Sequence, residues 1–176
     1  MPWNGLSSGK RWGLSALLGQ AALWGVAGLS LLSIPRAPLL DGETLALQVE
    51  VSIPLDRVTP GAREPNGIRL SLYAGDKDNH YADIDRAGFR EVNGMLVVTA
   101  LAGLNSTAPF RTLSFHIEDH TWLAYDLTAL PAVPTAKDLE WSEPRPMRDA
   151  REAGRDAAFS DVLLRHRVVK QGPPAR

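Results

Sequence analysis

The sequence predicts a mainly β protein with one N-terminal transmembrane α-helix, an antiparallel β-sandwich-like domain and an extended C-terminal arm. Three observations predict this fold class. An uncharged apolar stretch near the N-terminus is long enough to span a bilayer. Several later segments alternate apolar and polar residues, the period of half-buried strands. Prolines are frequent after residue 130, which predicts the extended arm. The length of 176 residues is enough for one domain in addition to the membrane span.

The predicted membrane span covers residues 13–34, which are 22 residues with no charge and a single Gln. As a helix this stretch is about 33 Å long, enough for a hydrocarbon core of about 30 Å. A cleaved signal peptide is the first alternative, but its apolar core is normally shorter and ends at small residues. Here the stretch ends in Ser33-Ile34-Pro35-Arg36. A buried helix of a soluble protein is the second alternative, and we expect an uncleaved anchor.

The orientation of the anchor follows from its flanking charges. Lys10 and Arg11 precede the span, whereas Arg36 alone follows it closely. The positive-inside rule then makes residues 1–12 cytoplasmic and the rest extracytoplasmic. The high content of Ala, Arg, Leu and Pro is typical of bacterial proteins. We therefore expect the bacterial inner (cytoplasmic) membrane, with the C-terminal domain in the periplasm.

Beyond the span we expect a linker at residues 35–44, a β-sandwich at 45–130 and a Pro-rich arm with a basic tail at 131–176. Residues 45–53 alternate strictly between apolar and polar. The same pattern predicts strands at 68–73, 95–101, 112–117 and 121–127, with short pieces near 81–84 and 89–92. Within the tail, composition predicts a short helix at 149–159 and a strand at 162–170.

Charge and cysteine content exclude several functions. The net charge of −1 gives no basic surplus for general nucleic-acid binding, and the absence of cysteine excludes thiol catalysis, disulfides and thiolate metal sites. Residues 35–144 hold nine basic and sixteen acidic residues, whereas residues 145–176 hold eight and four. This uneven charge has three explanations. The basic tail contacts its own acidic domain, it docks on an acidic partner, or the two segments form separate solvent-exposed surfaces of opposite charge.

An Asp-rich stretch after the second predicted strand is a candidate calcium site. Clustered carboxylates supply the hard oxygen ligands that calcium prefers. The spacing differs from a helix–loop–helix calcium loop, because Tyr81 stands where Gly is required and Ala87 where Glu is required. A solvated polar hairpin is the alternative. The candidate ligands are Asp76, Asp78, Asp83 and Asp85.

One further cluster could bind zinc or iron. On a regular strand His116, Glu118 and His120 share one face, and such a set suits an enzyme's metal site. These residues fall at a predicted turn, which favours exposed hairpin residues instead. The sequence has no Gly-x-Ser-x-Gly elbow, no Walker loop and no dinucleotide fingerprint. We therefore expect a protein that is not an enzyme and needs no cofactor.

Three tryptophans are candidate partner-binding residues, namely Trp24, Trp122 and Trp141. Tryptophan is frequent at binding hot spots, although it is equally common in cores. Together these features favour a non-catalytic, single-pass membrane accessory subunit that docks on and stabilises a larger integral membrane complex, for example a respiratory or photosynthetic one. The alternative is a membrane-tethered ion- or ligand-binding module with calcium at residues 76–85.

Overall fold

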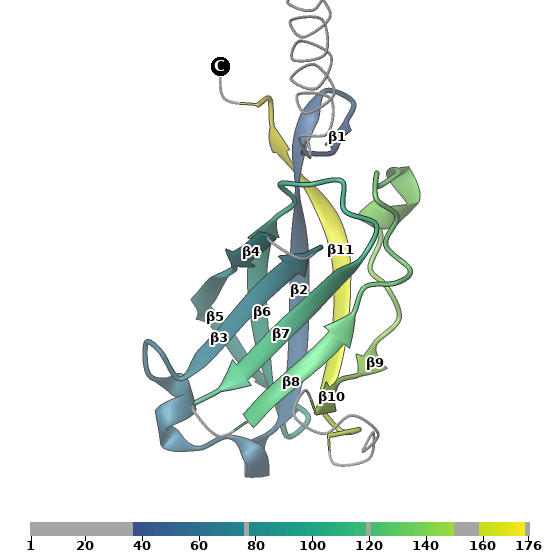
Figure 1. Cartoon of the computed structure of the whole chain (residues 1–176). Helices are drawn as coiled ribbons and strands as arrows, with labels where there is room; N and C mark the ends of the chain where they lie inside the picture. Colours follow the sequence, from purple (N-terminus) through teal and green to yellow (C-terminus); the bar gives the residue numbers. More distant parts are fainter. Residues whose placement is uncertain (1–36, 76–77, 119–120, 150–158, 175–176) are drawn as a thin grey trace, which may run out of the picture. The chain divides into compact units, whose positions relative to one another are not determined.

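Two antiparallel sheets enclose one hydrophobic core in the computed structural model, which describes residues 37–75, 78–118, 121–149 and 159–174 (Figure 1). The predicted mainly β, sandwich-like class is thereby confirmed for these residues. The described strands are β1 (Leu39–Leu40), β2 (Glu43–Pro54), β3 (Ile68–Ala74), β4 (Asp78–Tyr81), β5 (Asp83–Val92), β6 (Met95–Gly103), β7 (Arg111–Ile117), β8 (Thr121–Asp126), β9 (Arg145–Pro146), β10 (Arg148–Asp149) and β11 (Leu163–Gly172). The short 3-10 helices are η1 (Leu55–Arg57), η2 (Pro60–Arg63) and η3 (Ala136–Leu139).

Six of the described strands form the first sheet, which we call sheet A, in the order β5-β6-β2-β11-β9 with β1 paired to β2. The other five form sheet B, in the order β10-β8-β7-β3-β4. Alternate side chains of each strand point inward, as a pleated sheet requires. The inward residues of both sheets make one continuous core around Phe115, which is completely buried.

The C-terminal strand β11 lies inside sheet A, between β2 and β9. Its inward residues Leu164, His166 and Val168 are buried, and they alternate with Arg165 and Arg167 on the outer face. The strand predicted at residues 162–170 is therefore confirmed, and the sandwich includes residues well beyond 130. The pairing also brings basic residues of the tail onto acidic residues of the domain, as in the ion pair of Arg165 with Glu50.

Backbone pairing replaces irregular structure in two segments. The Asp-rich stretch, where the sequence predicts only a short strand near 81–84, forms β4 in sheet B and the start of β5 in sheet A within its described part. The chain crosses between the sheets at Ala82, whose N–H donates to the carbonyl of Leu70 at 2.9 Å. The expected linker likewise contains β1, which folds back on Glu43 and Thr44 through a tight turn. Strand pairing satisfies backbone groups that a loop leaves to water.

The helix predicted in the tail does not begin at the residue where the sequence pattern places its start. Asp149, the expected start of a helix, belongs to β10 and pairs with Leu123 of β8. Residues 150–158, the rest of that predicted helix, lie outside the described residues. The Pro-rich arm before it carries η3 and β9, and it runs along one edge of the sandwich from sheet B to sheet A (Figure 1).

The predicted membrane span at 13–34 also lies outside the described residues. Among the helices of the described part, none has both the length and the hydropathy to traverse a bilayer.

Candidate functional site

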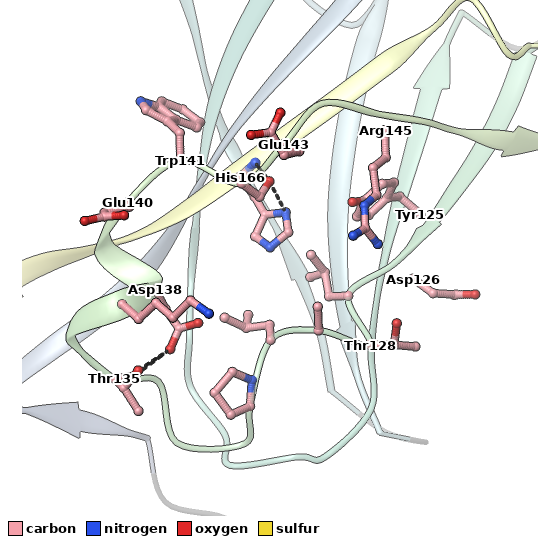
Figure 2. A pocket seen from close by; sticks show the side chains of 16 residues that line it. Tyr125, Asp126, Thr128, Thr135, Asp138, Glu140, Trp141, Glu143, Arg145 and His166 are labelled. Atoms are coloured by element: carbon pink, nitrogen blue, oxygen red, sulfur yellow. Dashed lines mark hydrogen bonds between the residues drawn. The ribbon is translucent and has the colours of Figure 1, made fainter.

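A cavity of about 580 Å³ opens at the edge of the sandwich where the arm crosses from β8 to β11 (Figure 2). Sheet B contributes Tyr125 and the residues that follow it, the arm contributes η3 and residues 140–145, and sheet A contributes His166. The cavity exists because the arm bridges the two sheets without filling the space between them.

His166 reaches the cavity because it occupies an inward position of β11. Its side chain is only 9% exposed. Ser142 of the arm fixes it at three points: the Ser142 N–H donates to the His166 carbonyl at 2.8 Å, the His166 N–H donates to Ser142 Oγ at 3.0 Å, and Ser142 Oγ lies 3.2 Å from Nδ1. These bonds join the arm to the strand much as a further strand would.

The serine contacts hold the ring without fixing its tautomer. Ser142 Oγ has one proton and two lone pairs, so after it accepts the backbone N–H of His166 it can either donate to Nδ1 or accept from an Nδ1–H. The ring is directed into the cavity in Figure 2, where Nε2 is a donor in one neutral tautomer and an acceptor in the other.

The ring is neutral at physiological pH. Burial lowers the pKa of His166, the positive charge of Arg145 lowers it further, and the carboxylate of Asp138 opposes both. Tyr125 packs edge-on against the ring with centroids 6.0 Å apart, and burial raises the pKa of its phenol although Arg145 pulls that pKa down. Both side chains are therefore uncharged at this pH.

Two cations and four carboxylates of the described residues line the cavity. Arg145 and Lys137 line it, and neither makes an ion pair with any described residue. Asp138 is occupied, since its Oδ2 accepts the N–H and the hydroxyl of Thr135 at 2.7 and 2.9 Å in the capping box of η3. The side chains of Glu140 and Glu143 point away from the cavity (Figure 2).

Trp141, a predicted partner-binding residue, stands beside this cavity but points away from it (Figure 2). Its ring covers the guanidinium groups of Arg165 and Arg167 at 4.6 and 4.8 Å from the ring centroid. Arg165 also pairs with Glu50, which pairs in turn with Arg90. The outer face of sheet A is thus a network of charged groups that satisfy one another.

Trp122, the second described tryptophan of the prediction, lies on the outer face of sheet B. It is 38% exposed, stacks on His116 with ring centroids 5.4 Å apart, and donates from Nε1 to Ser114 Oγ at 2.5 Å. Strand register places Tyr73 and Tyr81 on the same face. We name this surface the aromatic face; it comprises Ser71, Tyr73, Tyr81, Ser114, His116, Trp122 and Ala124. Trp24 lies outside the described residues.

The candidate calcium ligands are spread over two strands. Asp83 and Asp85 are exposed on β5, and Asp85 Oδ1 accepts the N–H of Gly88 at 3.0 Å. Asp78 belongs to β4, in the other sheet, and Asp76 lies outside the described residues. Within the part of the chain that the structure describes, no group of three or more His, Asp or Glu side chains could hold a metal ion. Calcium binding at this stretch stays a prediction.

The structure does not bring His116 and Glu118 together as a site. His116 lies under Trp122 on the aromatic face, whereas Glu118 follows the end of β7 in a left-handed conformation, φ 49°, and accepts a hydrogen bond from Thr59. His120 lies outside the described residues.

Sequence reasoning missed the cavity residues His166, Ser142 and Arg145. A signal for His166 exists, because it takes the place of an apolar residue between Leu164 and Val168 on the inward side of the strand. Nothing in the sequence pattern shows that an arm from twenty residues upstream covers it.

Comparisons with protein-family models, with curated proteins and with solved structures give no match to this chain.

Proposed function

We propose that the chain is a non-catalytic, single-pass accessory subunit of the bacterial inner membrane. Its N-terminus is cytoplasmic, and its sandwich docks on the periplasmic side of a larger integral membrane complex, for example a respiratory or photosynthetic one. The uncharged stretch at 13–34 supports the anchor, and the charges that flank it support the orientation.

The observation that carries the docking proposal is the aromatic face of sheet B. Tyr81 is 76% exposed, and Tyr73 and Trp122 are close to 40% exposed. Ser71 and Ser114 lie on the same face and are buried among their neighbours. Exposed Trp and Tyr side chains are enriched at interface centres. The hydrogen bond and the stacking contact of Trp122 hold its ring in place, which lowers the entropy lost on docking.

The position of the chain ends agrees with a tethered docking domain. Leu39 of β1 and Gly172 at the end of β11 both pair with Thr44, so the chain enters and leaves the sandwich at the same end (Figure 1). The aromatic face is a different surface, the outer side of sheet B.

Affinity purification of the full chain from its native membrane, in mild detergent, tests the proposal. We expect defined membrane proteins to co-purify with the wild-type chain and to be lost from the double variant Trp122→Ala, Tyr81→Ala. The matched control is Phe110→Ala, since Phe110 is also 76% exposed but lies in the loop before β7. A wild-type chain that runs alone and monomeric overturns the proposal, as does equal retention by both variants. Near-UV circular dichroism confirms that each variant is folded.

A further inference from the structure

We propose that the cavity at the sandwich edge binds a small organic carboxylate, with the carboxylate group held between Arg145 and His166. The apolar body of this ligand lies against Leu127 and Leu130. The inference concerns a site separate from the aromatic face, and it holds whether or not the domain docks on a complex.

Two polar groups of the cavity suit a carboxylate. Ser142 Oγ lies at Nδ1 of His166, so Nε2 is left for a ligand, and a carboxylate selects the neutral tautomer that carries its proton there. Arg145 is exposed, has no ion-pair partner among the described residues, and lines the cavity together with Tyr125 and His166. Arginine matches the planar carboxylate with two parallel hydrogen bonds. An acceptor-only anion completes this pair of groups.

Two of the four acidic side chains that line the cavity are bound to other residues, and the other two, Glu140 and Glu143, point away from it (Figure 2). Asp138 is held by Thr135 in the capping box, and Asp126 pairs with Arg148 of β10. The charge of Lys137 adds to that of Arg145 within the same wall. An unpaired Arg beside a buried imidazole therefore favours the arrival of a negative charge from outside the domain.

The size and the apolar part of the wall indicate a small organic molecule. A volume of about 580 Å³ lies within the range of about 300–1,000 Å³ typical of small-ligand sites. Leu127 and Leu130 are buried, with 1% and 3% exposure, and they line the cavity together with Pro131. A carboxylate with a short aliphatic or aromatic body satisfies both the donors and this apolar surface.

The test is calorimetric titration of the full chain, in detergent micelles, with phenylacetate as the probe. Phenylacetamide has the same shape without the charge, and inorganic phosphate has charge without the apolar body. We expect phenylacetate to bind, and phenylacetamide and phosphate to bind at least tenfold more weakly. Arg145→Gln should weaken phenylacetate binding about tenfold or more, because it removes a charge-assisted, bidentate contact.

The matched control is Arg167→Gln, which removes the same charge next to His166 but on the opposite face of β11. Its affinity should stay within about twofold of the wild type. A second readout needs no variant of the arginine: the chain has four histidines, so ring signals in carbon–proton NMR spectra are few. The signal that His166→Phe removes should shift with phenylacetate. Absence of binding, equal binding of phenylacetamide, or equal loss in both arginine variants overturns the proposal.

Discussion

The Nη2 atom of Arg111 lies 2.9 Å from the carbonyl oxygen of Ser106, at the end of the sandwich where the chain enters. The same guanidinium donates to the carbonyl oxygens of Pro131 and Ala132 at 2.9 and 3.0 Å. Arg111 is 3% exposed, and burial lowers its pKa without removing its charge. One buried cation thus ties the loop between β6 and β7 to the loop after β8, which forms part of the cavity wall.

Replacing Arg111 by Met should lower the free energy of unfolding by about 3 kcal/mol, because three carbonyl groups lose charge-assisted donors that water replaces poorly. Denaturant unfolding of the full chain measures this change. The control is Arg63→Met, whose ion pair with Glu91 is half exposed; its effect should not exceed about 1 kcal/mol. Similar effects in the two variants would show that Arg111 has no special role.

His166 should make stability depend on pH. Burial and Arg145 lower its pKa from the ordinary value of 6.5, while Asp138 opposes them and Tyr125 faces the same ring. Below about pH 6.5 the unfolded chain binds a proton that the folded ring resists. This contribution to stability is therefore complete above pH 6.5 and is lost as the pH falls toward the lower folded pKa.

Thermal unfolding between pH 7.5 and pH 5 measures the loss, and His166→Asn should flatten the curve relative to wild type. If the two curves coincide, His166 does not titrate with folding.

Gly67 should tolerate no side chain. A Cβ atom at this position would lie 1.9 Å from the carbonyl oxygen of Gly61, so the backbone of η2 must move. Gly94, in contrast, has a positive φ of 76° and open space around it. Gly67→Ala should therefore destabilise by more than about 2 kcal/mol, and Gly94→Ala by about 1 kcal/mol. Urea unfolding of both variants measures the two losses of stability. A larger loss in Gly94→Ala than in Gly67→Ala would contradict the close approach of Gly67 to the Gly61 carbonyl.

Glu50 should contribute more to the free energy of unfolding than an exposed ion-paired carboxylate such as Glu91. Its side chain is 12% exposed and contacts Arg165 at 2.6 Å and Arg90 at 2.9 Å. Glu50→Gln leaves two guanidinium groups side by side without a counter-charge, and we expect a loss of about 2 kcal/mol. Glu91→Gln should cost less than about 1 kcal/mol. Unfolding at increasing salt concentration adds a check, because added salt should reduce the difference in unfolding free energy between the two variants.

The strands could be predicted from the sequence because each buries one face. Residues such as Leu45 and Leu47 alternate with polar ones, and this period specifies a half-buried strand before any partner is known. The strands β1, β9 and β10 could not be predicted, because a segment of two residues is too short to show an alternation of apolar and polar side chains. The pairing of β11 with β2, across more than a hundred residues, also leaves no local pattern.

The candidate site was harder to predict than the fold. Its parts come from β8, the arm and β11, and only their folded arrangement creates the cavity. Trp141 illustrates the limit: its residue type predicts a binding anchor, but its ring covers Arg165 and Arg167 of its own domain. Trp122, of the same type, is held flat on an exposed face. The neighbours of each indole, rather than its identity, decide what it can contact.

The central position of β11 has a consequence for biosynthesis. Sheet A lacks an interior strand until residues 163–172 emerge from the ribosome, and β2 meanwhile presents an unpaired edge. Pairing that joins distant parts of a chain forms slowly. A nascent chain cut short before Leu163 would keep that edge exposed, so premature termination or proteolytic loss of the last strand should yield aggregates instead of a smaller working domain.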